Sequence, residues 1–164
     1  MKHPSILEQY RYLHEQGRFP GYSLREHLPE IRRNVQAADA KTLLDYGCGK
    51  ASCWLKEGAD KLIGIMPTLY DPGVRGIDKK PVGKFDGVIC TDVLEHCEDP
   101  EAVIADLVGY AEKFLFIAVS CLPSGPRKKL PDGRPLHICL HPPAWWRERI
   151  KADIPVILRF DVPG

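Results

Sequence analysis

The sequence predicts an α/β fold in which a largely parallel sheet carries helices on both faces. From residue 42 onward, short apolar runs alternate with helix-like stretches, which is typical of parallel strands joined by crossover helices. The runs at 85–91 and 113–119 are nearly continuous in apolar residues, as expected for strands buried on both faces. A Gly-x-Gly turn directly follows the first run, at the sheet edge where such folds bind ligands.

Length and composition limit the class of protein. The 164 residues suffice for one domain with its own core, and we expect a single domain over 1–164, with a helical lid at 1–40 and an α/β core at 41–164. Lys plus Arg is 23 and Asp plus Glu is 22, so a global field for nucleic acid or membrane surfaces is absent. The apolar runs are too short to span a bilayer, and no signal stretch opens the chain. We therefore expect a cytoplasmic protein without a membrane partner.

Two helical patterns precede the sheet. Ser5-Ile-Leu-Glu8 is a capping box, and Tyr10 and Leu13 continue the helical spacing. Ser23-Leu-Arg-Glu26 repeats the box and predicts a second helix, which Pro29 breaks or kinks because proline lacks an N–H.

The remaining elements follow in order along the chain. Strands are predicted at 42–46, 62–66, 85–91, 113–119 and 154–162. Helices are predicted at 51–57, at 100–111 behind an Asp-Pro start, and after His141-Pro-Pro-Ala144.

The strongest chemical signal is Asp45-Tyr46-Gly47-Cys48-Gly49. The glycines allow unusual backbone angles and the close approach of a ligand, and the carboxylate beside the turn can hold an ammonium group. The dinucleotide fingerprint is incomplete, because Ser52 occupies its third glycine position. A nicotinamide oxidoreductase is therefore disfavoured.

Polar residues also follow two later strands. Asp71-Pro72 comes after the second strand candidate, where a carboxylate can accept both hydroxyls of a ribose, although Asp-Pro also favours a plain turn. The run at 85–91 delivers Thr91 and Asp92 to the same edge, and Leu94-Glu95-His96 follows directly. Such polar residues at the end of a buried strand are candidates for a functional site.

Taken together, these motifs resemble those of the class I S-adenosylmethionine-dependent methyltransferases. The resemblance rests on Asp45–Gly49, on the acidic residue after the second strand and on Phe85–His96, and covers roughly residues 40 to 120. The remainder, with Leu130–Arg134, His137 and Trp145-Trp146, is similar to small uncharacterised methyltransferases of bacteria and phages, which names no substrate.

The resemblance implies a Rossmann-like methyltransferase sheet with S-adenosylmethionine as cofactor. Asp45 and the two glycines would line its methionine end, Asp71 would hold its ribose, and Tyr10 and Phe19 would form a lid. The full set of implied cofactor residues is Asp45, Gly47, Cys48, Gly49, Asp71, Pro72, Thr91, Asp92 and Val93.

The sequence also departs from the family pattern. The stretch 72–84 is too short for the helix, strand and turn that the family places there, so the third strand is at most a stub at 74–78. The C-terminal end holds one clear strand and at most a second at 137–140. We therefore expect a sheet trimmed around strand 3 and at the C-terminus, with five or six strands. The edge left by the trimming favours dimerisation, which we state as a hypothesis.

Methyl transfer from a sulfonium is an in-line displacement, in which the protein orients the reactants and excludes water. A general base is needed only where the acceptor must lose a proton, and the candidates are His137 and His96, with His141 third. The alternative without a catalytic role is that His137 is a loop histidine that only forms a hydrogen bond with a backbone carbonyl. The candidates for substrate binding are Arg134, Trp146 and Tyr10.

The acceptor is expected to be a small molecule. The loop Ser124–Arg134 is basic and would attract an anionic acceptor, unless it is simply solvated surface. No RNA-binding signature is present, and the family's amino-methylating nucleic-acid motif is absent at Asp92-Val-Leu-Glu95. The competing hypothesis is a cofactor-binding subunit that does not catalyse transfer or depends on a partner.

The six cysteines form no Cys-x-x-Cys pair, and several lie inside apolar runs, as buried reduced thiols do. The spacing of Cys121, His137, Cys139 and His141 fits no common zinc pattern, so the sequence predicts no metal site.

Overall fold

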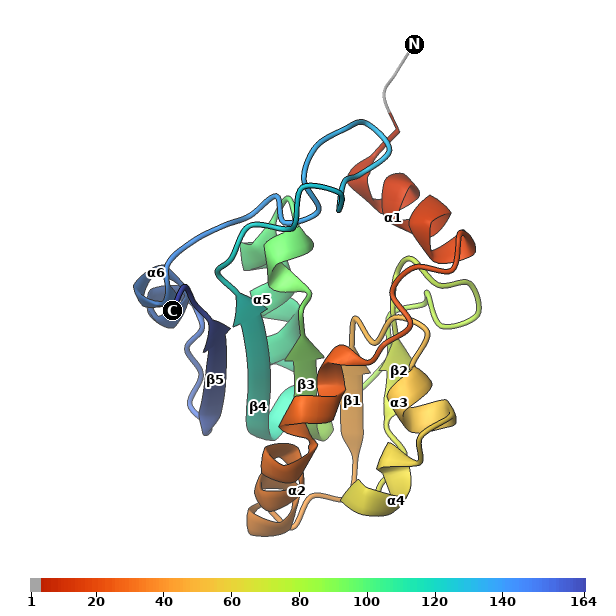
Figure 1. Cartoon of the computed structure of the whole chain (residues 1–164). Coiled ribbons are helices and arrows are strands. Elements are labelled where there is room, and N and C mark those ends of the chain that lie inside the picture. Colours follow the sequence, from red (N-terminus) through yellow and green to blue (C-terminus); the bar gives the residue numbers. More distant parts are fainter. Residues whose placement is uncertain (1–3) are drawn as a thin grey trace.

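The computed structural model describes residues 4–164, and its centre is a five-stranded sheet in which every neighbouring pair is parallel (Figure 1). The strands are β1 (Leu43–Tyr46), β2 (Thr68–Tyr70), β3 (Phe85–Thr91), β4 (Ala111–Ser120) and β5 (Val156–Asp161). Their spatial order is β2-β1-β3-β4-β5. The chain leaves β1 for β2 on one side and returns to β3 on the other, so the switch point lies between β1 and β3.

Helices cover both faces of the sheet (Figure 1). On one face lie η1 (Ser23–His27), α2 (Leu28–Ala37), α3 (Ser52–Leu55) and α4 (Ala59–Ile63), and on the other lie α5 (Pro100–Tyr110) and α6 (Pro143–Arg149). Side chains of β4 alternate between the two cores: Phe116 packs with the first group of helices and Leu115 with the second. Both sides of the central strands are therefore buried, which explains their continuous apolar runs.

The first helix, α1 (Ile6–Glu15), lies beyond the carboxyl ends of the strands rather than on a face of the sheet (Figure 1). The predicted capping box is present: Ser5 Oγ accepts from the Glu8 N–H, and Glu8 accepts from the Ser5 N–H. The helix buries Ile6 and Leu13 against Leu130 and Leu136 of the long loop between β4 and α6. Segments more than a hundred residues apart thus form a small third core above the sheet edge.

The expected α/β fold with a trimmed sheet is confirmed. Neither 74–78 nor 137–140 forms a strand in the described chain. The first of these is a tight turn closed by the Asp71 N–H, which donates to the Ile77 carbonyl at 3.0 Å. The sheet therefore has five strands, with the three-residue β2 at one edge.

The predicted strand at 62–66 is wrong. Residues Ala59–Ile63 form α4, which buries Ile63 and exposes Leu62, and the edge strand begins only at Thr68. An apolar run of five residues is too short for its periodicity to show whether it belongs to a strand or to the end of a helix. Gly64, with φ +87°, ends the helix and displaces the strand toward the C-terminus.

The predicted second helix also differs from the structure. Ser23 does not cap an α-helix: the segment Ser23–His27 is a 3₁₀ turn, and the Ser23 hydroxyl lies 3.5 Å from that of Thr91. Pro29 does not break a helix but stands in the first turn of α2, where its missing N–H has no helical acceptor to lose. No helix within residues 4–164 is long and apolar enough to cross a membrane.

Candidate functional site

The carboxyl ends of β1, β2 and β3 bring the predicted cofactor residues together. The N–H groups of Gly47 and Cys48 both donate to the Tyr70 carbonyl, at 2.7 and 3.2 Å, which joins the glycine turn to the end of β2. On its other side the turn touches the segment that follows β3: a Cβ built on Gly47 would lie 2.3 Å from Cγ2 of Val93. Gly47, with φ +80°, is therefore required by packing as well as by backbone conformation.

Asp45 is a buried carboxylate at the end of β1. Its Oδ2 accepts from the indole N–H of Trp54 at 2.6 Å, and Oδ1 has no hydrogen-bond partner among residues 4–164. Burial, with a smaller contribution from the charge of Asp71, raises the pKa of Asp45 to about 7. A buried carboxyl group without a cation beside it is suited to receive an ammonium group of a ligand.

Asp71 ties the glycine turn to β2. Its Oδ2 accepts from the Gly49 N–H and its Oδ1 from the Gly73 N–H, both at 2.8 Å. His14 of α1 approaches from the other side, with Nε2 3.6 Å from Oδ1. A carboxylate has about four lone-pair sites, so each oxygen keeps one for a ligand hydroxyl.

The other predicted cofactor residues lie around this centre. Cys48 is buried, and burial raises the pKa of its thiol well above the usual range, so it lines the turn as a neutral group. Pro72 is half-buried, and its carbonyl accepts from Nε of Arg11 at 3.2 Å. Thr91 is buried at the end of β3, whereas Asp92 is exposed and has a left-handed φ of +53°. That backbone conformation is unfavourable outside glycine and is typical of functional turns.

The N-terminal segment lies directly across the glycine turn. The N–H groups of Lys50 and Ser52 donate to the carbonyls of Phe19 and Pro20, at 3.2 and 3.0 Å. A Cβ on Gly49 would stand 2.7 Å from the Phe19 carbonyl oxygen. The space above Gly49, where a ligand was expected, is therefore occupied by the backbone of Phe19 in this conformation.

Aromatic rings from the N-terminal segment form the roof of the site. The ring of Phe19 lies 5.6 Å from that of Tyr10, 5.2 Å from His14 and 6.2 Å from His96, between ring centroids. Tyr10 and Phe19 thus lie close to His96, and their role as a lid stays a prediction.

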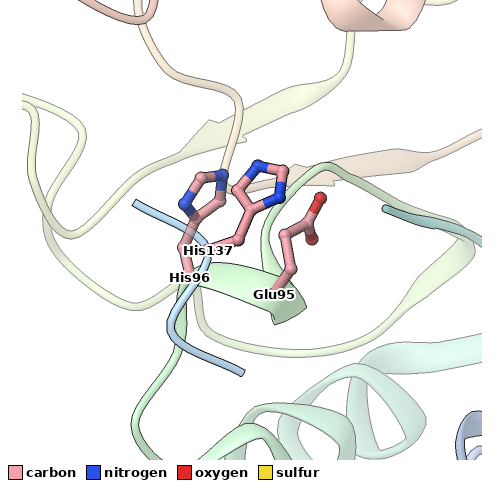
Figure 2. A group of neighbouring side chains, drawn as sticks. All are labelled: Glu95, His96 and His137. Carbon is pink, nitrogen blue, oxygen red and sulfur yellow. The ribbon is translucent and has the colours of Figure 1, made fainter. Parts of the chain in front are cut away.

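Glu95, His96 and His137 form a compact cluster next to this roof. One potential ligand atom of each lies within 4.8 Å of those of the other two. Figure 2 shows the two imidazole rings side by side, with the Glu95 carboxylate on the far side of the His137 ring. The ring centroids are 4.8 Å apart and the rings are nearly perpendicular, at 84°. Both histidines named as candidate bases are therefore brought together.

Backbone carbonyls determine which ring nitrogen carries the proton. Nδ1 of His137 lies 2.6 Å from the Leu122 carbonyl, and Nδ1 of His96 lies 3.0 Å from that of Leu136. Because a carbonyl only accepts, each Nδ1 bears the hydrogen and donates it. The Tyr10 hydroxyl donates to the same Leu136 carbonyl and lies 2.8 Å from Nδ1 of His96. With Nδ1 donating, Nε2 is the ring nitrogen that stays free to accept in both histidines.

Glu95 is the most enclosed member of the cluster. It has no exposed surface, its Oε1 accepts from the Ser120 N–H at 3.0 Å, and its Oε2 has no partner. Burial raises the pKa of Glu95 to about 8 and lowers that of His96 to about 4. In both cases the shift favours the uncharged form, because water is excluded.

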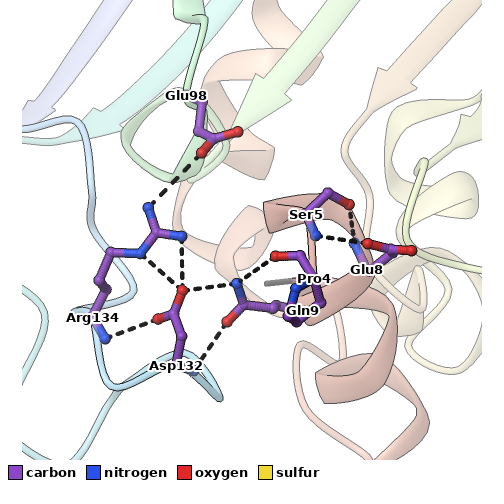
Figure 3. A network of polar contacts seen from close by, with 7 residues as sticks. All are labelled: Pro4, Ser5, Glu8, Gln9, Glu98, Asp132 and Arg134. Atoms are coloured by element: carbon purple, nitrogen blue, oxygen red, sulfur yellow. Dashed lines mark hydrogen bonds and ion pairs between the residues drawn. The ribbon is translucent and has the colours of Figure 1, made fainter. Parts of the chain in front are cut away.

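Two predicted substrate residues have other roles. Trp146 as a substrate wall is wrong: it is fully buried under the sheet, and its indole N–H donates to the His141 carbonyl at 3.2 Å. Arg134 is exposed, and its guanidinium pairs with Asp132 at 2.7 Å and Glu98 at 3.8 Å (Figure 3). Its charge is already balanced at the loop that supports α1.

Sequence reasoning missed one member of the site, His14. Glu95 was singled out together with His96 as a polar residue at the end of a buried strand, although no role was assigned to it. His14 had no signal at all, because its partner Asp71 is 57 residues away in sequence and only tertiary packing joins them.

Two cavities of the structure lie away from these residues. One of about 390 Å³ is lined by residues just before or at the amino ends of β3, β4 and β5, including Lys84, Ala111 and Ile154. That is the opposite edge of the sheet from the glycine turn. We place the functional site at the carboxyl edge, because the polar groups and the perturbed pKa values gather there.

The strand order places the switch point beside a Gly-x-Gly turn, with Asp45 near the end of β1 and Asp71 directly after β2. This arrangement is that of a Rossmann-like α/β fold. Residues 13–125 match the family model described as a methyltransferase domain. The chain belongs to the class I S-adenosylmethionine-dependent methyltransferase family. No curated protein and no solved structure matches it.

Proposed function

We propose that this chain transfers a methyl group from S-adenosylmethionine to a small, anionic acceptor. The observation that carries the proposal is the buried carboxylate of Asp45, whose Oδ1 lacks a partner beside the glycine turn. An α-ammonium group would supply the missing charge and hydrogen bond. The free lone pairs of Asp71 would accept ribose hydroxyls on the same side of the turn.

The remaining cofactor residues would enclose the ligand. Gly47, Cys48 and Gly49 would line its methionine portion, Pro72 the turn beside the ribose, and Thr91, Asp92 and Val93 the adenosine edge. Because Phe19 and Pro20 hold the turn through backbone hydrogen bonds, the segment 17–22 would shift to admit the ligand and then cover it. Closure of this kind excludes water from the reaction.

The cofactor supplies the methyl group as an electrophile on a sulfonium, and the electron pair of the broken C–S bond stays on sulfur. The chain orients the acceptor in line with that bond. Where the acceptor is a hydroxyl, its proton passes to Nε2 of His137 or His96, the basic nitrogens that the carbonyls of Leu122 and Leu136 leave free.

The basic loop suggests the charge of the acceptor. Arg127, Lys128 and Lys129 are exposed and form no ion pair within residues 4–164, unlike Arg134. They follow β4, on the side of the sheet edge where His137 lies. They would attract an anionic acceptor. Arg134 would instead stabilise the loop through its ion pairs with Asp132 and Glu98.

A second candidate function is a cofactor-binding subunit without transferase activity of its own. The covered glycine turn and the three-residue edge strand β2 favour it. Product formation separates the two, because only the first yields S-adenosylhomocysteine in the presence of an acceptor.

Calorimetric titration with S-adenosylmethionine and S-adenosylhomocysteine tests the proposal, with nicotinamide dinucleotide as the control ligand. We expect micromolar binding of the first two, weakened at least about tenfold by Asp71→Ala, which corresponds to about 1.4 kcal/mol. Absence of binding by folded protein freed of copurified ligand would overturn the cofactor assignment. A screen of acceptors with a labelled methyl group would then identify the substrate.

A further inference from the structure

The cluster of Glu95, His96 and His137 has the composition of a metal centre rather than of a simple acid–base pair. Two imidazoles and one carboxylate offer three ligand atoms within 4.8 Å of one another. Two histidines with one carboxylate and open remaining positions bind first-row divalent metals. The ligand atoms come from η2 (Leu94–His96) and from the loop after β4, both held at the sheet edge.

An independent observation points to a ligand. Oε2 of Glu95 is buried and has no hydrogen-bond partner, although its sister oxygen is held by the Ser120 N–H. A buried polar atom without a partner is costly, by about 1–3 kcal/mol, and is rarely left so without a reason. No Lys or Arg forms an ion pair with Glu95 among residues 4–164, so no protein cation occupies the position beside this buried carboxyl group.

The surroundings of the histidines match those of metal ligands. Metal-bound histidine usually donates its second ring N–H to a carbonyl or carboxylate, which orients the ring and directs the other nitrogen at the ion. Here Nδ1 of His137 is held by the Leu122 carbonyl, and Nδ1 of His96 by the Leu136 carbonyl. Both Nε2 atoms are therefore available as ligands.

We infer that Glu95, His96 and His137 bind a first-row divalent transition-metal ion, with Glu95 and the two Nε2 atoms as protein ligands. Glu95 is fully buried and the histidines are half-buried, so the open coordination positions lie on the histidine side. On the proposed methyltransferase function, on which this last step rests, those positions take an oxygen of the acceptor. The ion would lower the pKa of that hydroxyl so that its proton passes to water, because Nε2 atoms bound to the ion could no longer act as the base.

Cobalt(II) is the probe for the test, because its visible absorption reports the ligand set. Tag-free full-length protein is freed of metal with a chelator and titrated with CoCl₂. We expect one equivalent to bind, with ligand-field bands. Glu95→Gln keeps an acceptor for the Ser120 N–H, and His137→Gln removes one imidazole. Each is expected to weaken cobalt binding at least about tenfold.

His141→Gln is the matched control. His141 lies in the same loop but stacks on Trp145, at 3.6 Å between centroids, and does not belong to the cluster. Its loss is expected to leave cobalt binding unchanged. Circular dichroism and thermal unfolding establish that each variant is folded. No stoichiometric cobalt binding by the wild type, or binding that survives both Glu95→Gln and His137→Gln, would overturn the inference.

The proposed metal site and the proposed cofactor site can be tested independently of each other. S-adenosylmethionine is titrated in the presence of excess chelator, which removes the ion but not the Asp45 and Asp71 pocket. Cofactor binding without cobalt binding would reject the metal site alone. Cobalt binding without cofactor binding would support the metal site and reject the proposed function.

Discussion

Gln9 and Asp132 hold each other through two hydrogen bonds across 123 residues of sequence. Nε2 of Gln9 donates to Oδ2 of Asp132 at 2.8 Å, and the Asp132 N–H donates to Oε1 of Gln9 at 3.1 Å (Figure 3). Gln9 is 1% exposed, so both ends of its amide are used within the protein. This pair is the main polar link between α1 and the loop that carries His137.

Gln9→Ala is expected to destabilise this link. Loss of the side chain removes both hydrogen bonds to the exposed Asp132, at a cost of about 0.5–1.5 kcal/mol for each. The free energy of unfolding from denaturant titration measures the loss, and hydrogen exchange is expected to rise in α1. Gln36→Ala, at an exposed position of α2, is the control and should stay within about 0.5 kcal/mol of wild type. Equal losses of unfolding free energy in Gln9→Ala and Gln36→Ala would contradict a stabilising role of the Gln9–Asp132 pair.

Asp45→Asn is expected to stabilise the ligand-free protein at pH 8 and not at pH 4. The folded-state pKa of Asp45, about 7, lies above its value of 3.8 in an unfolded chain. The folded state therefore suffers no penalty from Asp45 below about pH 4, where the carboxyl group is protonated in both states. As the pH rises toward 7, the free energy of unfolding falls by on the order of 4 kcal/mol in all. Asparagine keeps an acceptor for Trp54 and removes that loss.

The same variant is expected to lose affinity for S-adenosylmethionine, because the amide cannot pair with an ammonium group. Denaturant unfolding at both pH values and calorimetry check the two effects. A variant less stable than wild type at pH 8, or one with undiminished cofactor affinity, would contradict the role given to Asp45.

Gly49→Ala is expected to displace the N-terminal segment. The new Cβ meets the Phe19 carbonyl at 2.7 Å, in addition to the left-handed φ of +57°. Gly58→Ala is the matched control, since its φ is +72° but its Cβ meets only a lysine side chain at 3.7 Å. The control should lose about 1–2 kcal/mol and Gly49→Ala more.

Hydrogen exchange distinguishes displacement of the segment from general destabilisation. The amides of Lys50 and Ser52, which donate to Phe19 and Pro20, should exchange faster in Gly49→Ala than in Gly58→Ala when both are corrected for global stability. Equal protection in the two variants would show that the segment does not depend on the space above Gly49.

Trp146→Phe is expected to lower stability without changing ligand affinity. Trp146 is fully buried, so a smaller ring leaves a cavity and removes the hydrogen bond to the His141 carbonyl, at a cost of about 1–3 kcal/mol. Trp145→Phe, on the half-buried neighbour, should cost less. Calorimetry with S-adenosylhomocysteine is expected to give the wild-type constant within about twofold. A larger change in affinity would show that Trp146 contributes to ligand binding after all.

Local patterns predicted much of the fold. The continuous apolar runs of β3 and β4, the Ser5–Glu8 capping box and the Asp99-Pro100 start of α5 each depend on neighbouring residues, and all were predicted within a few residues. The glycine turn was predicted for the same reason. The edge strand was misplaced, because the apolar run 62–66 is too short to carry a period.

The sequence by itself determined the fold class, the trimmed sheet and the edge at which polar residues gather, because periodicity, turn residues and connection lengths are local properties. Tertiary structure alone decided that Trp146 is core, that Phe19 covers Gly49, that His14 meets Asp71, and that Glu95 faces His137. Each of these depends on contacts between segments far apart in sequence, where burial and hydrogen bonding are settled only once the sheet has brought the segments together.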